Sequence, residues 1–154
     1  MTLAELDEAR LLECCGSSHW AAQMLAARPF RDLPGLETVA TDIWWRLTPA
    51  DWLEAFSKHP KIGERGKVSA WSSQEQSGMN SAALETAEKL AALNQSYFDK
   101  FGWIFIVCAT GKTAEEMLSL LESRLPNLPD DELRIAAAEQ NKITLLRLRK
   151  LLCL

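Results

Sequence analysis

The chain has 154 residues, of which 47% are hydrophobic, and this length and composition fit one domain, residues 1–154, with a sizeable buried core. Seventeen Lys and Arg residues against 21 Asp and Glu residues give a net charge of -4. Because the basic residues are scattered along the chain, they form no stripe of the kind that nucleic-acid-binding proteins carry. The composition therefore favours a small molecule or another protein as partner.

The N-terminal stretch and the apolar runs predict a cytoplasmic protein. "MTLAELDEARLLECC" has acidic residues early and lacks the basic and apolar regions of a secretory signal. The longest apolar run, residues 103–109, is far shorter than the ~18 residues that a membrane-spanning helix needs. In the cytoplasm the four cysteines are expected to stay reduced, and no Cys/His spacing predicts a metal site.

Start and stop signals predict an all-α fold, a single-domain bundle of six or more helices. In the N-terminal half they predict helices over residues 3–15, from 17 or 18 to 28, 36–47 and 49–59. Thr2 and Glu5 form a capping box for the first helix, and Pro49 directly after Thr48 is typical of a helix start. Pro60 ends the fourth helix because helical geometry is disfavoured before proline.

In the C-terminal half, helices are predicted from 72 to about 100, with a bend near Ser77–Gly78, from 113 to 125, and from about 130 to the end. The run "WIFIVCA" has strand propensity, but one short strand without a partner leaves its backbone groups unsatisfied. We expect one short extended segment buried among the helices. The sequence "ATGKT" ends like a phosphate-binding loop, but Ile106 stands where that motif needs glycine. A glycine turn before a helix capped by Thr113 and Glu116 explains it.

Two stretches carry polar side chains suited to chemistry. His59, in "HPKIGE", is either a helix-end residue favoured by the helix dipole or a group that moves a proton. The glycine-rich loop that follows it, residues 61–69, is suited to act as a lid. In "WSSQEQSG", Glu75 either closes a capping box with Ser72 or helps a helix N-terminus to hold a polar ligand.

Taken together, "HPKIGE", "WSSQEQSG" and "LNQSYFDKFGWIFIV" resemble the 2-oxo-4-hydroxy-4-carboxy-5-ureidoimidazoline (OHCU) decarboxylase family. The resemblance extends to "RLPN" and to "KITLLRLRKLL" at the C-terminus. It implies an all-helical homodimer that decarboxylates OHCU to (S)-allantoin in urate catabolism and uses no cofactor or metal. It also implies a small-molecule substrate, in agreement with the charge distribution and the short apolar runs, which predict no nucleic-acid or membrane partner.

The resemblance also implies the residues of the site. His59 falls on the proton-transferring histidine and Pro60 on a neighbouring substrate contact. The substrate-gripping segment falls on Ser72, Ser73, Gln74, Glu75 and Gln76, with Glu75 as the key acid. Backbone contacts with the substrate fall on Ile104, Phe105, Ile106, Val107, Cys108 and Ala109.

An essential arginine is also implied, and the last helix offers Arg147. Ile143 and Leu151 lie four residues to either side of it, which predicts an inward-looking face. Arg134 and Arg124 are the alternatives. The competing functional hypothesis is a non-enzymatic interaction domain whose anchors are Trp44, Trp45 and Trp52. The spacing of these three tryptophans fits a core equally well, and we expect them in the core.

Overall fold

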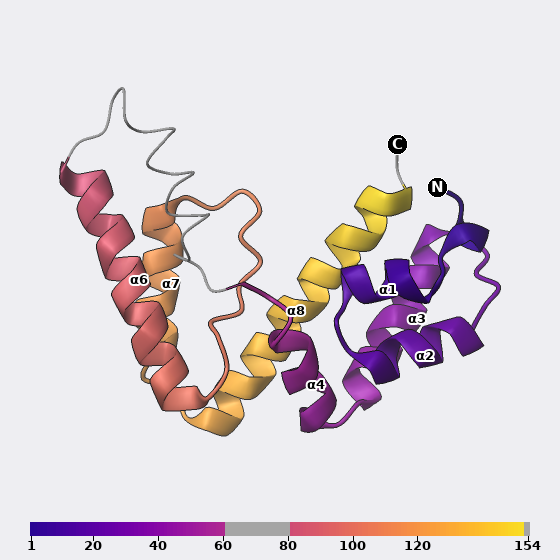
Figure 1. Cartoon of the computed structure of the whole chain (residues 1–154), viewed down its shortest axis with the longest axis horizontal. Coiled ribbons are helices and arrows are strands. Elements are labelled where there is room, and N and C mark those ends of the chain that lie inside the picture. Colours follow the sequence, from indigo (N-terminus) through magenta and orange to yellow (C-terminus); the bar gives the residue numbers. More distant parts are fainter. Residues whose placement is uncertain (61–80, 153–154) are drawn as a thin grey trace. The chain divides into compact units, whose positions relative to one another are not determined.

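The computed structural model describes residues 1–60 and 81–152 (Figure 1). Helices dominate these residues and no strand occurs among them, so the predicted all-α fold is confirmed. The elements are η1 (Leu3–Glu5), α1 (Glu8–Cys14), α2 (Ser18–Ala26), α3 (Leu33–Arg46), α4 (Pro49–Phe56), α6 (Ser81–Phe101), α7 (Ala114–Arg124) and α8 (Pro129–Leu152). No helix in these two ranges is both long and apolar enough to cross a bilayer.

The chain divides into two compact units, each with its own internal packing. One contains residues 1–58 together with the chain from Ile135 onward, and the other contains residues 59–134. The long helix α8 therefore contributes residues to both units. The prediction of a single domain over residues 1–154 stays a prediction.

The predicted first helix is wrong as one element, because the chain breaks it at Leu6. Leu6 is fully buried and extended, with φ -70° and ψ 103°. Asp7 then starts α1, and its carboxylate accepts a hydrogen bond from the backbone N–H of Arg10 at 3.0 Å. Asp is favoured at such a cap over a helix interior because its short side chain competes for backbone N–H groups. The capping contact between Glu5 and the N–H of Thr2 is present, at 3.0 Å.

Two further helix boundaries differ from the prediction by three residues. Helix α3 begins at Leu33, since Asp32 accepts from the Gly35 N–H at 2.8 Å and Pro34 fits the first helical turn. Helix α4 ends at Phe56, so His59 lies in a bend beyond the helix. The helices predicted over residues 113–125 and from about 130 onward are confirmed within one residue as α7 and α8.

Buried tryptophans organise the unit that contains α1 to α4. The indole N–H of Trp20 donates to the Ala40 carbonyl at 3.2 Å, and that of Trp44 donates to the Ala137 carbonyl at 2.9 Å. Trp52 donates to the Trp44 carbonyl at 2.9 Å. Burying an indole in this way costs little because its one donor is satisfied. Trp44 and Trp52 are core residues as predicted.

Trp45 is the exception among the three tryptophans, since 41% of its surface is exposed. It packs edge-on against Trp52, with 5.7 Å between ring centroids. The prediction that all three lie in the core is therefore wrong for Trp45. An anchor patch built from all three is not formed either, because two of them are buried.

The other unit packs α6 beside α7 around an aromatic core (Figure 1). Residues 104–109 run through it without regular secondary structure, which confirms the predicted extended segment. Gly102 and Gly111 lie at the two ends, with φ of +86° and +77°, a conformation that side-chain-bearing residues adopt at a cost. The buried cluster consists of Leu90, Tyr97, Phe101, Phe105, Val107, Met117 and Leu121.

Candidate active site

His59 follows the fourth helix at a distance that weakens a purely helix-capping role. It lies three residues beyond Phe56 in a bend and is half-buried, while Pro60 is exposed. A helix dipole acts within the last turn and falls off beyond it. Residues 61–80 are outside the described residues, and so are the predicted lid and the segment Ser72 to Gln76 with Glu75. The two interpretations of Glu75, as a cap and as a substrate ligand, both stay predictions.

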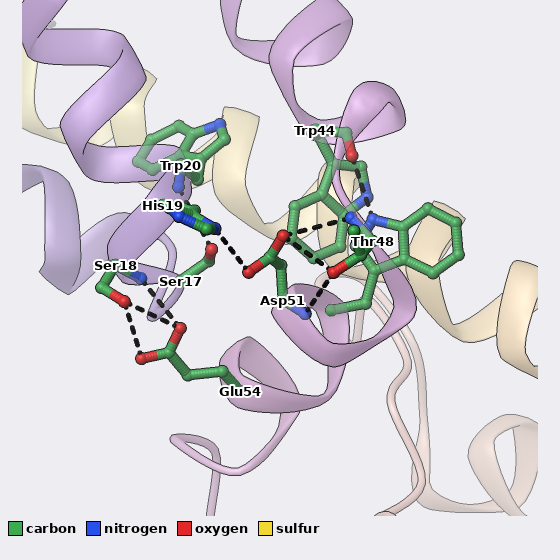
Figure 2. Close-up of polar contacts among 9 residues, drawn as sticks. Ser17, Ser18, His19, Trp20, Trp44, Thr48, Asp51 and Glu54 are labelled. Atoms are coloured by element: carbon green, nitrogen blue, oxygen red, sulfur yellow. Dashed lines mark hydrogen bonds and ion pairs between the residues drawn. The ribbon is translucent and has the colours of Figure 1, made fainter.

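The helix that precedes His59 is tied to α2 by polar side chains (Figure 2). Thr48 and Asp51 form a capping box, with the Asp51 carboxylate 3.1 Å from the Thr48 backbone nitrogen. The same carboxylate lies 2.9 Å from Nδ1 of His19, and Glu54 accepts from the Ser18 backbone N–H at 3.1 Å and from its hydroxyl at 3.0 Å. We call these five residues the α2–α4 cluster. It holds α4, and hence the start of the turn that leads to His59.

His19, the other histidine of the chain, has a structural role here. Its side chain is 71% exposed, and Asp51 orients it from the side. Burial raises the pKa of Asp51, but hydrogen bonds from the Thr48 backbone and from His19 outweigh burial and leave this pKa below its ordinary value. The carboxylate is therefore ionised, as an N-terminal helix cap requires.

The extended segment 104–109 is held by two cationic side chains. Nη1 of Arg124 donates to the Ile106 carbonyl at 2.7 Å, and Nζ of Lys112 donates to the Cys108 carbonyl at 2.8 Å. The side chains of residues 104–108 are buried. Charged donors thus replace the ladder hydrogen bonds that a neighbouring strand would supply.

Arg124 belongs to a buried polar network that the sequence did not reveal. Its Nε and Nη2 donate to one carboxylate oxygen of Glu132 at 2.8 and 2.5 Å, and Glu132 is fully buried. The Tyr97 hydroxyl donates to the same oxygen, and the Trp103 indole donates to Tyr97 at 3.1 Å. Asn127 donates to the other oxygen of Glu132 at 3.0 Å. Burial and the neighbouring Glu132 raise the pKa of Tyr97, which keeps its hydroxyl protonated as a donor.

The sequence carried no signal that separates Glu132 from an exposed acid. Fully or nearly fully buried side chains recur every four residues along α8, and the stripe consists of Glu132, Ala136, Gln140, Thr144 and Leu148. A stripe with three polar members does not stand out in a hydrophobicity pattern. Glu132 also follows two other acids, Asp130 and Asp131, so it was indistinguishable from the acids that commonly favour a helix N-terminus.

The three candidate arginines have different surroundings. Arg124 is 6% exposed and donates hydrogen bonds to Glu132 and to the Ile106 carbonyl, so its guanidinium has a structural role. Arg134 is exposed on α8. Arg147 is half-buried and its Nη1 lies 3.4 Å from the Glu13 carbonyl. Among the three, Arg147 combines partial burial with an accessible guanidinium.

The face of α8 around Arg147 is less enclosed than predicted. Ile143 and Leu151 are half-buried, and the fully buried stripe runs one residue away, through Thr144 and Leu148. Arg147 lines a pocket of about 240 Å³ together with Glu13, Cys14, Lys150 and Leu151. Burial raises the pKa of Cys14 to about 12, so this cysteine stays a neutral thiol in the pocket.

The predicted site residues fall in both compact units. His59 and residues 104–109 belong to the unit of residues 59–134, and Arg147 belongs to the other unit. That they form one site stays a prediction.

Comparison with known proteins agrees with the motifs. A family model described as OHCU decarboxylase matches residues 4–149. The uric acid degradation bifunctional protein TTL of Arabidopsis thaliana is 42% identical over 155 residues, covering 96% of this chain and 48% of the plant protein. A 2-oxo-4-hydroxy-4-carboxy-5-ureidoimidazoline decarboxylase of Halalkalicoccus jeotgali is 28% identical, covering 97% of this chain and 89% of that protein. The chain spans less than half the length of the bifunctional relatives it matches.

A solved structure agrees as well. A crystal structure of OHCU decarboxylase in the presence of (S)-allantoin is similar with a TM-score of 0.79 and 41% sequence identity. The similarity covers 95% of this chain and 98% of that one. At this identity and coverage, the similarity extends to the whole helical fold described above.

Proposed function

The chain belongs to the OHCU decarboxylase family, and we propose that it converts OHCU to (S)-allantoin in urate degradation. The observation that carries the proposal is the 41% identity over 98% of a solved OHCU decarboxylase chain, with a TM-score of 0.79. Both the helical fold and the motif "HPKIGE" are then accounted for by one activity. The reaction class is that of a carboxy-lyase.

The chemistry explains why side chains are sufficient for this reaction. The substrate carries a carboxylate and a hydroxyl on one ring carbon and an imine on the next. When the bond to CO2 breaks, its electron pair forms a double bond between the two carbons and the imine nitrogen takes a proton. The hydroxyl then loses its proton as the carbonyl forms, and the second carbon gains one. Because the substrate holds its own electron sink, the protein must orient the ring and move protons.

The proposed roles follow from this proton balance. His59 takes the hydroxyl proton and supplies a proton to the adjacent carbon, which suits an imidazole because its ring can both accept and donate a proton. Delivery from one face sets the handedness of the product. Arg147 holds the substrate carboxylate with two parallel N–H bonds, for which its partly exposed position in a pocket is suitable.

The remaining contacts orient the ring. Glu75 accepts hydrogen bonds from substrate N–H groups, and Ser72, Ser73, Gln74 and Gln76 bind the substrate with it. Pro60 lies next to the acting histidine and contacts the substrate. Backbone groups of residues 104–109 complete the site, and buried side chains that anchor this segment support that role, because an anchored backbone is preorganised. We further propose a cytoplasmic homodimer as the working form.

The decisive experiment follows the handedness of the product. Urate oxidase and the hydrolase that follows it generate OHCU in place, and chelator-treated protein is added. We expect faster loss of OHCU and optically active (S)-allantoin. Spontaneous decay yields a racemate, because water delivers the proton to either face. Racemic allantoin formed at the uncatalysed rate would contradict the proposed function.

A further inference from the structure

Of the two cationic side chains that hold the backbone of the extended segment 104–109, Arg124 is the one that reaches its middle. Nη1 of Arg124 reaches the Ile106 carbonyl at 2.7 Å, in the middle of the segment. The Arg124 guanidinium also lies over the Phe105 ring, 4.5 Å from its centroid. The guanidinium of Arg124 thus contacts both the backbone of Ile106 and the side chain of Phe105. A small movement of this guanidinium would move the Ile106 carbonyl with it.

The direction of Arg124 is set by Glu132. A guanidinium is planar and rigid, so two bonds from Nε and Nη2 to one carboxylate leave Nη1 pointing along a fixed line. Here those bonds are 2.8 and 2.5 Å long, and that line ends on the Ile106 carbonyl. Glu132 also accepts hydrogen bonds from Tyr97 and Asn127, one on each carboxylate oxygen, but the bonds from Nε and Nη2 are the ones that orient the guanidinium.

Stability alone does not account for such a pair. Burying two charges costs several kcal/mol of hydration, and apolar residues of similar volume often serve as well or better. Apolar residues in these positions could not donate a hydrogen bond, whereas Arg124, oriented by Glu132, donates to the main-chain carbonyl of Ile106. This hydrogen bond has a functional consequence where the backbone of the segment itself contacts the substrate.

We propose that Arg124 and Glu132 are positioning residues for the decarboxylase reaction, setting the register of the 104–109 backbone that contacts the substrate. The inference rests on the proposed function and deepens it, because it assigns a role to two residues that have none in the proposed mechanism. Neither residue touches the substrate. Each acts through the Ile106 carbonyl.

Arg124→Lys is the informative variant. It keeps the positive charge, but one ammonium group cannot reproduce the rigid fork that joins Glu132 to Ile106. We expect KM for OHCU to rise and kcat/KM to fall about 10- to 100-fold, the range for losing a well-placed hydrogen bond to a charged group. Backbone amides of residues 104–109 should exchange hydrogen faster, and the helical circular dichroism should be retained.

Tyr97→Phe is the matched control. It removes a hydrogen bond to the same buried carboxylate while keeping the aromatic ring and the contact from Arg124 to Ile106. We expect it to lower the midpoint of denaturation, with kcat/KM and exchange in 104–109 within about twofold of wild type. If both variants lose activity in proportion to stability, the network is only structural and the inference fails.

A second variant covers the case in which Arg124→Lys does not fold. Arg124→Met combined with Glu132→Leu replaces the pair by apolar residues of similar size, which proteins often tolerate. Folded protein with at least a tenfold lower kcat/KM supports the inference, and folded protein with wild-type kcat/KM overturns it. Failure of the double variant to fold would show that the fold itself requires the pair, and this also overturns the inference.

The two proposals fail in different ways. Wild-type protein that does not accelerate OHCU loss removes the proposed function, and the positioning role with it. Active wild-type protein with fully active, folded Arg124→Lys removes the positioning role alone. Amide exchange in residues 104–109 reports on the segment without any turnover, so it separates a displaced backbone from a damaged catalytic group.

Discussion

The two polar clusters described above differ in burial, and so in what they contribute to the fold. In the α2–α4 cluster, His19 is 71% exposed and its bond to Asp51 competes with water. In the Arg124–Glu132 network the acid is fully buried, so both charged groups depend on protein hydrogen bonds in place of hydration. Exposed ion pairs contribute about 0–1 kcal/mol, whereas breaking a buried pair costs several. The exposed cluster caps helices, and the buried network fixes a main-chain segment.

The largest effect is expected at the other histidine. His59→Gln should lower kcat/KM by roughly 10²- to 10⁴-fold, the usual contribution of a general acid/base, with little change in unfolding free energy. His19→Gln is the matched control, since it removes an imidazole from the exposed cluster. We expect that control to keep activity within about twofold, measured by OHCU loss. Full activity in His59→Gln would return this residue to a purely structural role.

The next effect is on stability. Glu132→Ala leaves the Arg124 guanidinium buried without its carboxylate, and should lower the unfolding free energy by about 3–5 kcal/mol. Chemical denaturation followed by circular dichroism measures it. Glu122→Ala, at an exposed position on α7, is the control and should change stability by about 0.5 kcal/mol or less. Equal losses in the two variants would mean that the burial of Glu132 does not determine the cost of removing it.

A third prediction compares Asp51, which closes a capping box, with Glu75, which is predicted to close one. Glu75→Gln can still close a box with Ser72, so its stability cost should be well below ~1 kcal/mol. Losing the charge that accepts substrate N–H groups should lower kcat/KM roughly 10- to 100-fold. Asp51→Asn, in the exposed cluster, should cost comparable stability and leave turnover near wild type. Normal turnover in Glu75→Gln would leave that residue as a cap only.

The smallest effect is on the pH dependence of stability. The pKa of Asp51 is lowered in the folded chain, so its contribution is complete above the ordinary carboxyl pKa near 4 and is lost as the pH falls through the lowered value. Denaturation midpoints measured between pH 5 and pH 2 should fall less steeply in Asp51→Asn than in wild type. The difference should stay below ~1 kcal/mol and shrink in high salt, because the pair is near solvent. An unchanged pH slope would contradict this assignment.

Local signals located most of the helices. The box of Thr113 and Glu116 starts α7, and Thr48 with Pro49 starts α4, because these signals act through hydrogen bonds three residues apart. They failed where a competing interaction was stronger. Leu6 left the helix to be buried while Asp7 offered a second cap, and α4 ended before His59.

By itself, the sequence determined the helical class, the extended segment and the family, since these depend on contacts close in sequence or on ordered motifs. Tertiary structure decided that Glu132 contacts Tyr97, 35 residues away. It also decided that Arg124 is buried in intramolecular hydrogen bonds, whereas Arg147 lines a pocket. An acid in the first turn of a helix is the same in sequence whether it faces water or a buried guanidinium. Its role depends on the energy of burial, which is known only once distant segments have packed around it.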